Sequence, residues 1–429
     1  MKKIQIKNID ESLYYEKLEN GMEVYMVPKT TSTETFASFT TKYGGIHNEF
    51  KNSDKKKFIK VPTGIAHFLE HKMFEQEDGR DPFSFFAESG TYCNAFTNYY
   101  NTSYLFSGNT ELENNLNYLL DFVQKPYFTD ENVEKEKGII EQEIKMYDDK
   151  ADRIIYEKLL YNIFINHPMK YSIAGRVEDI RKITKEDLYT CYNTFYNPNN
   201  MFLVLTGNFN PEDIINIIKE NQNKKEFEKK EIPILKDYIE PNKVAKKHDQ
   251  QKMNIDTPYL SFGIKIPLKN IKNMDHKKRN LYFATCFYYL FGETSEFNER
   301  ITNEKLLDSS LDIEMIDTKD HKIVILVCKS KKYDELLFNI DKHLKDINVD
   351  EDFLERRKKV FKSSLIYIYE NISDINRNIL DNIITYGKCD CDIYDIVDSL
   401  NKEELDKMIL KLDLSNTSTF IIKPIKIKE

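Results

Sequence analysis

The chain has 429 residues, with 63 Lys and Arg against 71 Asp and Glu, so it carries a mild acidic excess. Because no basic stripe stands out and no window is long and apolar enough to cross a bilayer, we expect neither nucleic-acid nor membrane binding. The first residues lack the apolar region of a secretion signal, and the six cysteines form no disulfide framework. We therefore expect a cytoplasmic protein with reduced thiols.

The first elements along the chain lead to a short helix with an apolar stripe. A strand is predicted at Thr35–Tyr43, and the charged stretch Asn48–Lys60 after it is expected to be a solvated surface loop. A helix should follow Pro62, with Thr63 as its N-cap. Apolar side chains recur at helical spacing along this helix, at Ile65, Phe68, Leu69 and Met73.

This predicted helix carries the most informative motif in the chain, His67-Phe68-Leu69-Glu70-His71. Two histidines four residues apart lie on one helical face and can bind the same metal ion. Glu70 lies on the same turn, close enough to act on a water bound to that ion. The H-x-x-E-H order is the reverse of the commoner H-E-x-x-H zinc-peptidase helix. The alternative is a chance pattern with two histidines at the edge of the core.

A catalytic zinc site needs a third protein ligand in addition to the two histidines. A later helix is predicted to start with Thr129 as its N-cap and acidic residues in its first turn. Glu136, Ile140, Glu143 and Tyr147 keep to one face of that helix, so both glutamates point the same way. Either is a candidate ligand, and an acidic face that is merely solvated is the alternative.

The second half of the chain repeats the first at an offset of about 220 residues. Two helices within Asn109–Tyr147 correspond to two within Lys332–Tyr367, and the strand Thr35–Tyr43 corresponds to Pro258–Ile266. A polar stretch rich in Lys and Glu, about Lys219–Gln251, separates the halves as a solvated linker. We expect an α+β fold of two homologous sandwich domains, each with helices layered on a mostly antiparallel sheet. The predicted domains are residues 1–225 and 251–429, joined by a linker at 226–250.

The repeat does not carry the metal-binding motif into the second half. The corresponding helix, expected at Lys277–Phe291, contains neither histidine nor glutamate. Arg356 pairs with Glu136, and Ser363 pairs with Glu143. We therefore expect one metal site, in the first domain.

Three segments together resemble the pitrilysin/insulinase zinc metallopeptidases, the inverzincins. They are His67–His71, Glu136–Glu143, and Tyr196–Met201 followed by Gly207. The resemblance covers essentially the whole chain and is closest to bacterial members that act as two-subunit processing peptidases. It implies that His67, His71 and Glu143 bind Zn²⁺, that Glu70 is the general base, and that Glu136 is a further catalytic carboxylate supporting the site.

The resemblance also implies how a peptide substrate is held. Gly90–Thr97 looks like the edge strand of the family, which pairs with an extended peptide beside the zinc. On this comparison, Asn94, Ala95 and Phe96 are the expected substrate-binding residues. An ordinary edge strand without this role is the alternative.

One departure from the family predicts a partner. Self-sufficient members carry an Arg and a Tyr in the second half that bind the substrate carbonyl. The matching positions here are Thr302 and Asp308 or Ser309, and Arg300 is out of register. We expect a related, zinc-less subunit to supply this Arg/Tyr clamp. The sequence thus predicts the catalytic subunit of a heterodimeric zinc endopeptidase acting on unfolded peptides or a peptide precursor. The alternative is a non-catalytic structural or scaffolding subunit.

Overall fold

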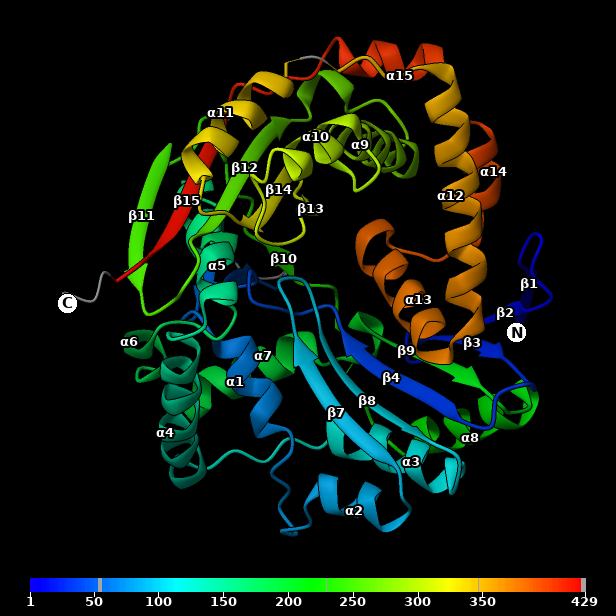
Figure 1. Ribbon diagram of the computed structural model, residues 1–429. Helices are drawn as coiled ribbons and strands as arrows, with labels where there is room; N and C mark the ends of the chain where they lie inside the picture. Colours follow the sequence, from blue (N-terminus) through cyan, green and yellow to red (C-terminus); the bar gives the residue numbers. More distant parts are fainter. Residues whose placement is uncertain (53–55, 229, 346, 426–429) are drawn as a thin grey trace. The chain divides into compact units, whose positions relative to one another are not determined.

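The computed structural model describes residues 1–52, 56–228, 230–345 and 347–425. The chain forms two compact units that interleave along the sequence. The first unit comprises Met1–Ile144, Ser172–Asp237 and Ser364–Asp392, and the second comprises Lys145–Tyr171, Tyr238–Ser363 and Ile393–Glu429. Each unit layers helices on a mainly antiparallel sheet (Figure 1), which confirms the predicted fold class. The predicted domain boundaries at residues 225 and 251 come from the sequence repeat, and they stay a prediction.

The first unit is built on a seven-stranded sheet. In spatial order its strands are β1 (Lys2–Gln5), β2 (Ser12–Lys17), β3 (Glu23–Pro28), β9 (Met201–Gly207), β4 (Thr35–Thr41), β8 (Thr102–Gly108) and β7 (Tyr92–Thr97). β3 and β9 are parallel, and the other neighbouring strands pair antiparallel. β7 therefore lies at one edge of the sheet, with β8 as its neighbour.

Both faces of this sheet are covered, so its central strands are apolar on both sides. All seven residues of β9 are buried. Leu203 and Leu205 belong to the larger core cluster, whereas Phe202 and Val204 belong to a second cluster together with Ile379. The larger cluster draws on α1 (Ile65–Lys72), α3 (Leu112–Val123), α7 (Lys185–Phe195) and α8 (Pro211–Asn223). The second draws on α13 (Ile372–Tyr386).

The second unit is built on a five-stranded sheet. Its strands, in order, are β11 (His248–Met253), β15 (Thr417–Pro424), β12 (Tyr259–Pro267), β14 (His321–Lys329) and β13 (Asp312–Asp317). The first pair is parallel and the others are antiparallel. One helix, α5 (Ala151–Ile163), packs so closely on β12 that a Cβ at Gly263 would lie 2.5 Å from Ile163 Cδ1.

The two sheets share one topology, which confirms the predicted internal duplication. The order β3-β9-β4-β8-β7 in the first unit matches β11-β15-β12-β14-β13 in the second, including the parallel first pair. β4 and β12, which the sequence repeat predicted to correspond, occupy the same place. Each sheet also receives a helix from the other half of the sequence, since α13 contacts β9 and β4 while α5 contacts β15 and β12.

The remaining helices complete the two units. In the first they are α2 (Pro82–Glu88), α4 (Asp130–Tyr147), whose last residues pass into the second unit, and α6 (Val177–Ile180). In the second they are α9 (His276–Phe291), α10 (Glu296–Asn303), α11 (Tyr333–His343), α12 (Glu351–Glu370), whose last residues belong to the first unit, α14 (Ile393–Asp398) and α15 (Lys402–Ile409). The helix predicted at Lys277–Phe291 begins one residue earlier and so includes a histidine.

Two stretches predicted to be solvated connectors contain regular structure. β5 (Glu49–Lys51) and β6 (Ile59–Lys60) lie in the expected surface loop, and β10 (Ile234–Leu235) lies in the expected linker. These strands form one small sheet in the order β10-β5-β6. Phe50 is fully buried beneath it. The prediction that the charged stretch is a simple surface loop was therefore wrong, because β5 pairs with β6 and β10 and its middle residue, Phe50, faces the core.

Candidate metal centre

The two histidines lie on α1, which the apolar stripe anchors to the core. Ile65, Phe68, Leu69 and Met73 are all buried, as predicted. The predicted N-cap was wrong, because the helix is capped by Gly64 at φ 85°. A Cβ at Gly64 would lie 2.5 Å from the Ala174 carbonyl oxygen, so this close approach requires glycine. The Thr63 hydroxyl instead donates a hydrogen bond to Asp179 Oδ2, at 2.8 Å.

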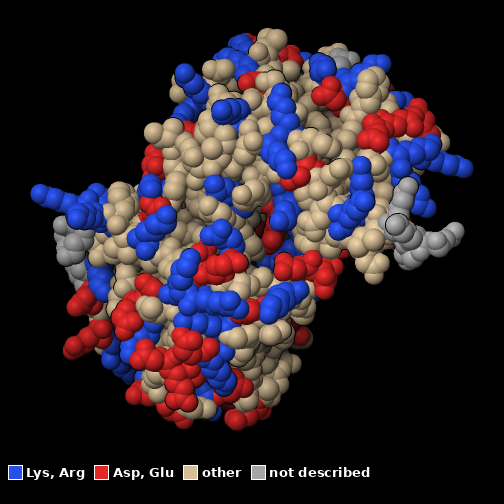
Figure 2. Space-filling model, turned by 90° about the vertical axis from the view of Figure 1, so that its left-hand side faces the viewer, with Lys and Arg blue, Asp and Glu red and all other residues tan. Residues whose placement is uncertain are grey.

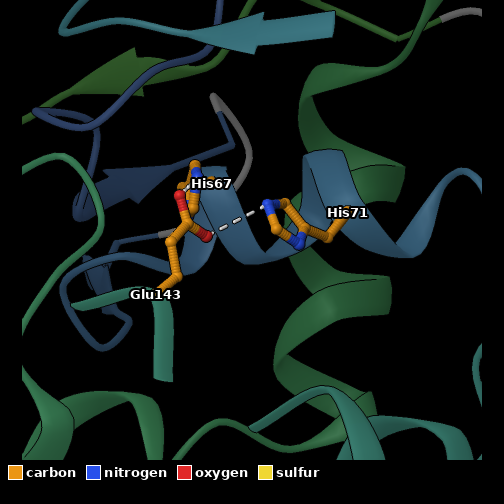
Figure 3. Close-up of side chains that lie close together, drawn as sticks. All are labelled: His67, His71 and Glu143. Atoms are coloured by element: carbon orange, nitrogen blue, oxygen red, sulfur yellow. Dashed lines mark ion pairs between the residues drawn. The ribbon is translucent and has the colours of Figure 1, made fainter. Parts of the chain in front are cut away.

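Glu143 on α4 meets both histidines. His67 Nε2 lies 3.7 Å from Glu143 Oε1, and His71 Nε2 lies 3.6 Å from Oε2. Figure 3 shows the two imidazoles projecting from one helix with the carboxylate between them. Among the described residues, this is the one group of three His, Cys, Asp or Glu side chains whose ligand atoms lie close enough to hold a metal ion.

The spacing of these donor atoms fits a zinc ion. Donors about 2.1 Å from zinc in tetrahedral geometry lie about 3.4 Å from one another. The separations of 3.6 and 3.7 Å are close to that value. Two imidazoles and one carboxylate also leave a fourth position for water or substrate, which is the ligand count of catalytic zinc sites.

α4 is held at its beginning by a reciprocal cap and by a buried lysine from α1. Thr129 Oγ1 accepts from the Asn132 backbone N–H at 3.1 Å, and the Thr129 N–H donates to Asn132 Oδ1 at 2.9 Å. The predicted N-cap is therefore confirmed. The fully buried Lys72 Nζ donates to the Asn132 carbonyl oxygen at 3.3 Å and pairs with Glu75. Lys72 thus connects the helix that carries the histidines to the start of the helix that carries Glu143.

Glu136, two turns before Glu143, contacts the opposite edge of the His71 ring. Glu136 Oε1 lies 3.0 Å from His71 Nδ1, so Nε2 is left facing Glu143. A ligand histidine commonly donates its second N–H to a carboxylate in this way, which fixes the tautomer and ring orientation. Burial alone would lower the pKa of His71, but the Glu136 hydrogen bond and the surrounding carboxylates raise it above its usual range.

Glu70 lies on the same helix in a largely buried position, close enough to His71 and Glu143 for their charges to act on it. The residue is 8% exposed, and its Oε2 accepts a hydrogen bond of 2.6 Å from the Thr97 hydroxyl at the end of β7. Burial raises the pKa of the Glu70 carboxyl, and the Thr97 bond opposes that shift in part. A carboxyl with a raised pKa accepts a proton more readily near neutral pH, as a general base must.

Two buried tyrosines lie close to Glu70. The Tyr104 and Tyr196 hydroxyls are 2.9 Å apart. Burial raises the pKa of both phenols, and the charge of Glu70 raises it further. Both phenols therefore stay neutral hydrogen-bonding groups beside the carboxylate.

β7 passes α1 as an exposed edge strand (Figure 1). Asn94 and Phe96 are exposed, whereas Ala95 is half-buried and faces the other side of the sheet. The Ala95 N–H donates a hydrogen bond to the side-chain Oδ1 of its neighbour Asn94 at 2.9 Å. β7 is the last strand of its sheet, so its outer edge is where an added strand would pair.

The second unit contains neither the ligand set nor the Arg/Tyr pair. α9 corresponds to α1, and among the described residues no second metal-binding group was found. Thr302 Oγ1 lies 3.3 Å from Asn298 Oδ1, and Asp308 Oδ2 accepts from the Lys331 N–H at 2.6 Å. The out-of-register Arg300 packs over the Phe297 ring instead.

Sequence reasoning missed Thr97 and Lys72. Thr97 was recognised only as the end of a strand, although its inward position on β7 marks it as facing α1. Lys72 follows His71 directly, and its place on the buried side of the helix was the available signal.

The surface and the helices agree with the composition. On the face shown in Figure 2, Lys and Arg side chains are interspersed with Asp and Glu. No helix within the described part of the chain combines the length and the hydropathy needed to cross a membrane.

The chain is similar to proteins of one peptidase family. Residues 60–176 match the family model described as insulinase, peptidase family M16, and residues 182–360 match the M16 inactive domain. The uncharacterized zinc protease YmfH of Bacillus subtilis is 37% identical over 408 residues, covering 95% of this chain and 94% of that protein. The beta subunit of the mitochondrial-processing peptidase of Caenorhabditis elegans is 28% identical over 202 residues, 46% of this chain and 42% of the subunit. The crystal structure of an M16-like peptidase from Alicyclobacillus acidocaldarius superposes with a TM-score of 0.90 at 31% identity, covering 98% of this chain and all of that one.

Proposed function

The chain belongs to the insulinase-type peptidase family M16, and we propose that it is a zinc-dependent endopeptidase that hydrolyses unfolded peptides or a peptide precursor. The observation that carries this proposal is the convergence of His67, His71 and Glu143 on one point beside Glu70. A donor set of this kind has no role in packing, and its spacing fits zinc.

The chain's own residues supply the binding and the proton transfers. His67, His71 and Glu143 would hold the zinc ion, and Glu136 would orient His71. Bound zinc supplies Lewis acidity, which polarises a carbonyl and makes a water more acidic. Glu70 accepts a proton from the attacking water at Oε1 and returns it to the leaving amine when the peptide bond breaks.

The substrate would be held as an added strand on β7. A peptide in extended conformation can pair with the free edge through backbone hydrogen bonds, which favours unfolded segments over folded proteins. Ala95 would offer its backbone there, and Asn94 and Phe96 would offer side chains. The edge position of β7 and the exposed side chains of Asn94 and Phe96 support this assignment.

The proposal includes a partner subunit and a cytoplasmic location. Because Thr302, Asp308 and Ser309 stand where an Arg/Tyr clamp is expected, a related zinc-less chain would supply that pair. The relative in the mitochondrial-processing peptidase is named as one subunit, which supports a two-chain enzyme. All six cysteines are free, in keeping with a reducing compartment.

The decisive experiment measures zinc content and peptide cleavage together. The tagged chain is purified from its own cells with its bound partners, and also alone after recombinant expression, as wild type and Glu70→Gln. We expect about one zinc per chain in every sample. Wild-type complex should cleave unstructured fluorogenic peptides, and Glu70→Gln complex should not.

Each part of the proposal has its own contrary result. A complex without zinc-dependent cleavage would leave a scaffolding subunit as the better interpretation. A Glu70→Gln complex with wild-type turnover would remove Glu70 as the base. A lone chain as active as the complex would refute the clamp supplied by a partner, because one lost carbonyl contact should reduce the rate by about 100-fold or more.

A further inference from the structure

We propose that Thr97 is a positioning residue that fixes the orientation of the Glu70 carboxylate, so that one oxygen is reserved for proton transfer. This inference rests on the proposed peptidase function and deepens it. Thr97 Oγ1 lies 2.6 Å from Glu70 Oε2 and is the one side-chain hydrogen-bond partner of that carboxylate within the described residues.

The direction of this hydrogen bond is determined by chemistry. An ionised carboxylate has no hydrogen to give, so the Thr97 hydroxyl must donate to Oε2. Oε1 keeps its acceptor capacity and becomes the oxygen that takes the proton from the attacking water. When Oε1 carries that proton, Oε2 still accepts from Thr97, so the contact persists through both halves of the proton transfer.

Thr97 also packs against its register partner on β8. Its Oγ1 lies 3.1 Å from Thr102 Oγ1, across the β7–β8 pair in which the two residues are in register. Thr102 is fully buried and donates its one hydroxyl hydrogen to the Tyr43 carbonyl oxygen at 2.9 Å. Because Thr97 donates its own hydrogen to Glu70, the two threonine hydroxyls meet as a packing contact and not as a hydrogen bond. A β-branched side chain between two fixed partners has few rotamers open to it. The position of the Glu70 carboxylate is therefore tied through Thr97 to the central sheet.

The second unit uses the same place in its fold differently. Asp317 ends β13 as Thr97 ends β7, and it pairs in register with Lys322 as Thr97 pairs with Thr102. Asn280 on α9 donates to Asp317 Oδ2 at 2.9 Å. In both units, therefore, the last residue of the edge strand hydrogen-bonds a side chain of the helix that packs on it. In the second unit that residue, Asp317, also forms a charged pair with its register partner Lys322. In the first unit, Thr97 and Thr102 are neutral, so this strand pair places no positive charge beside Glu70. A base requires this, because a neighbouring cation would lower its affinity for a proton.

The test compares Thr97→Val with Thr97→Ser in the purified complex. Valine keeps the shape and loses the hydroxyl, whereas serine keeps the hydroxyl. We expect Thr97→Val to lower kcat about 10- to 100-fold, part of the contribution of a positioned general base, with KM within about twofold of wild type. Zinc content should be unchanged, and Thr97→Ser should recover most of kcat. Thr40→Val is the matched control, since Thr40 is a fully buried threonine of the same sheet, bonded to Ser103 at 2.8 Å.

A second readout does not depend on activity. In crystal structures, wild-type Glu70 should occupy one rotamer, and Thr97→Val should show it turned away or in several. Unchanged kcat together with an unmoved Glu70 in Thr97→Val would overturn the inference. If wild type has no zinc-dependent cleavage, the proposed function fails, and the crystal structures still decide whether Thr97 orients Glu70.

Discussion

Replacing Glu136 tests how the proposed site would hold a zinc ion. Glu136 Oε1 lies 3.0 Å from His71 Nδ1, and its side chain is 12% exposed, so this hydrogen bond is shielded from water. Glu136→Gln keeps an acceptor oxygen but loses the charge. Hydrogen bonds to charged groups contribute about 1.5–3 kcal/mol and neutral ones about 0.5–1.5 kcal/mol, so the variant should lose about 1–1.5 kcal/mol. That difference weakens zinc binding by about 5- to 10-fold.

Glu136→Met removes the acceptor as well and should reach the 10- to 100-fold loss, roughly, that is typical when the carboxylate behind a ligand histidine is removed. The assay is a competition titration of the metal-free protein against a chelator of known affinity. Glu134→Gln is the control, because Glu134 lies on the same helix, is 69% exposed and pairs with Lys137. Zinc affinity of Glu136→Met within twofold of wild type would refute the role given to Glu136.

Three further predictions concern the metal and the two units. Chelating the metal should increase backbone hydrogen exchange in the second half of α4 more than at its capped start, because Val133 near the start is buried. Equal exchange with and without zinc would contradict this prediction. Glu240→Gln should lower the free energy of unfolding by about 3–5 kcal/mol in urea titrations, because it leaves Lys265, whose side chain is 0% exposed, without its counter-charge. A loss below about 1 kcal/mol would argue against a buried ion pair. Burial alone would raise the pKa of the Asp317 carboxyl, but His276 and Lys322 hold that pKa at about 2. The stability that ionised Asp317 contributes is therefore complete above the unfolded pKa of about 3.9, and it is lost as the pH falls towards 2. The stability gap between wild type and Asp317→Asn should therefore narrow below about pH 4, and a gap independent of pH would count against this assignment.

The two helices of the metal centre were predictable because local sequence determines them. A stripe of apolar residues sets the face of α1, and its period places His67 and His71 together. The Thr129 cap and the seven-residue step from Glu136 to Glu143 do the same for α4. What the pattern left open was which glutamate approaches the imidazoles, since both lie on one face. The structure places both against the histidines, Glu143 at the donor atoms and Glu136 behind the ring.

The elements that were not predicted depend on contacts far along the chain. Glycine is required at position 64 because the Ala174 carbonyl oxygen lies close to it, and no local sequence pattern predicts this contact. β5 pairs with β10, a two-residue apolar strand inside a polar stretch whose composition is typical of a linker. The contact of Thr97 with Glu70 forms only in the folded chain, where the end of β7 lies beside Glu70. In each case the deciding neighbour comes from another element, so no sequence window contains it.

The second unit shows that the scaffold does not need the ligand cluster. There, the helices that correspond to α1 and α4 meet through packing, with the Arg357 guanidinium 4.4 Å from the Tyr288 ring and Tyr289 edge-on to Phe353 at 5.1 Å. The first unit instead places three carboxylates around two imidazoles, an arrangement whose like charges repel unless a cation lies among them. Since the same topology forms with aromatic and cation–π contacts, a fold-stabilising role does not account for these acidic and imidazole side chains. Their concentration in one unit is what the proposed zinc chemistry requires.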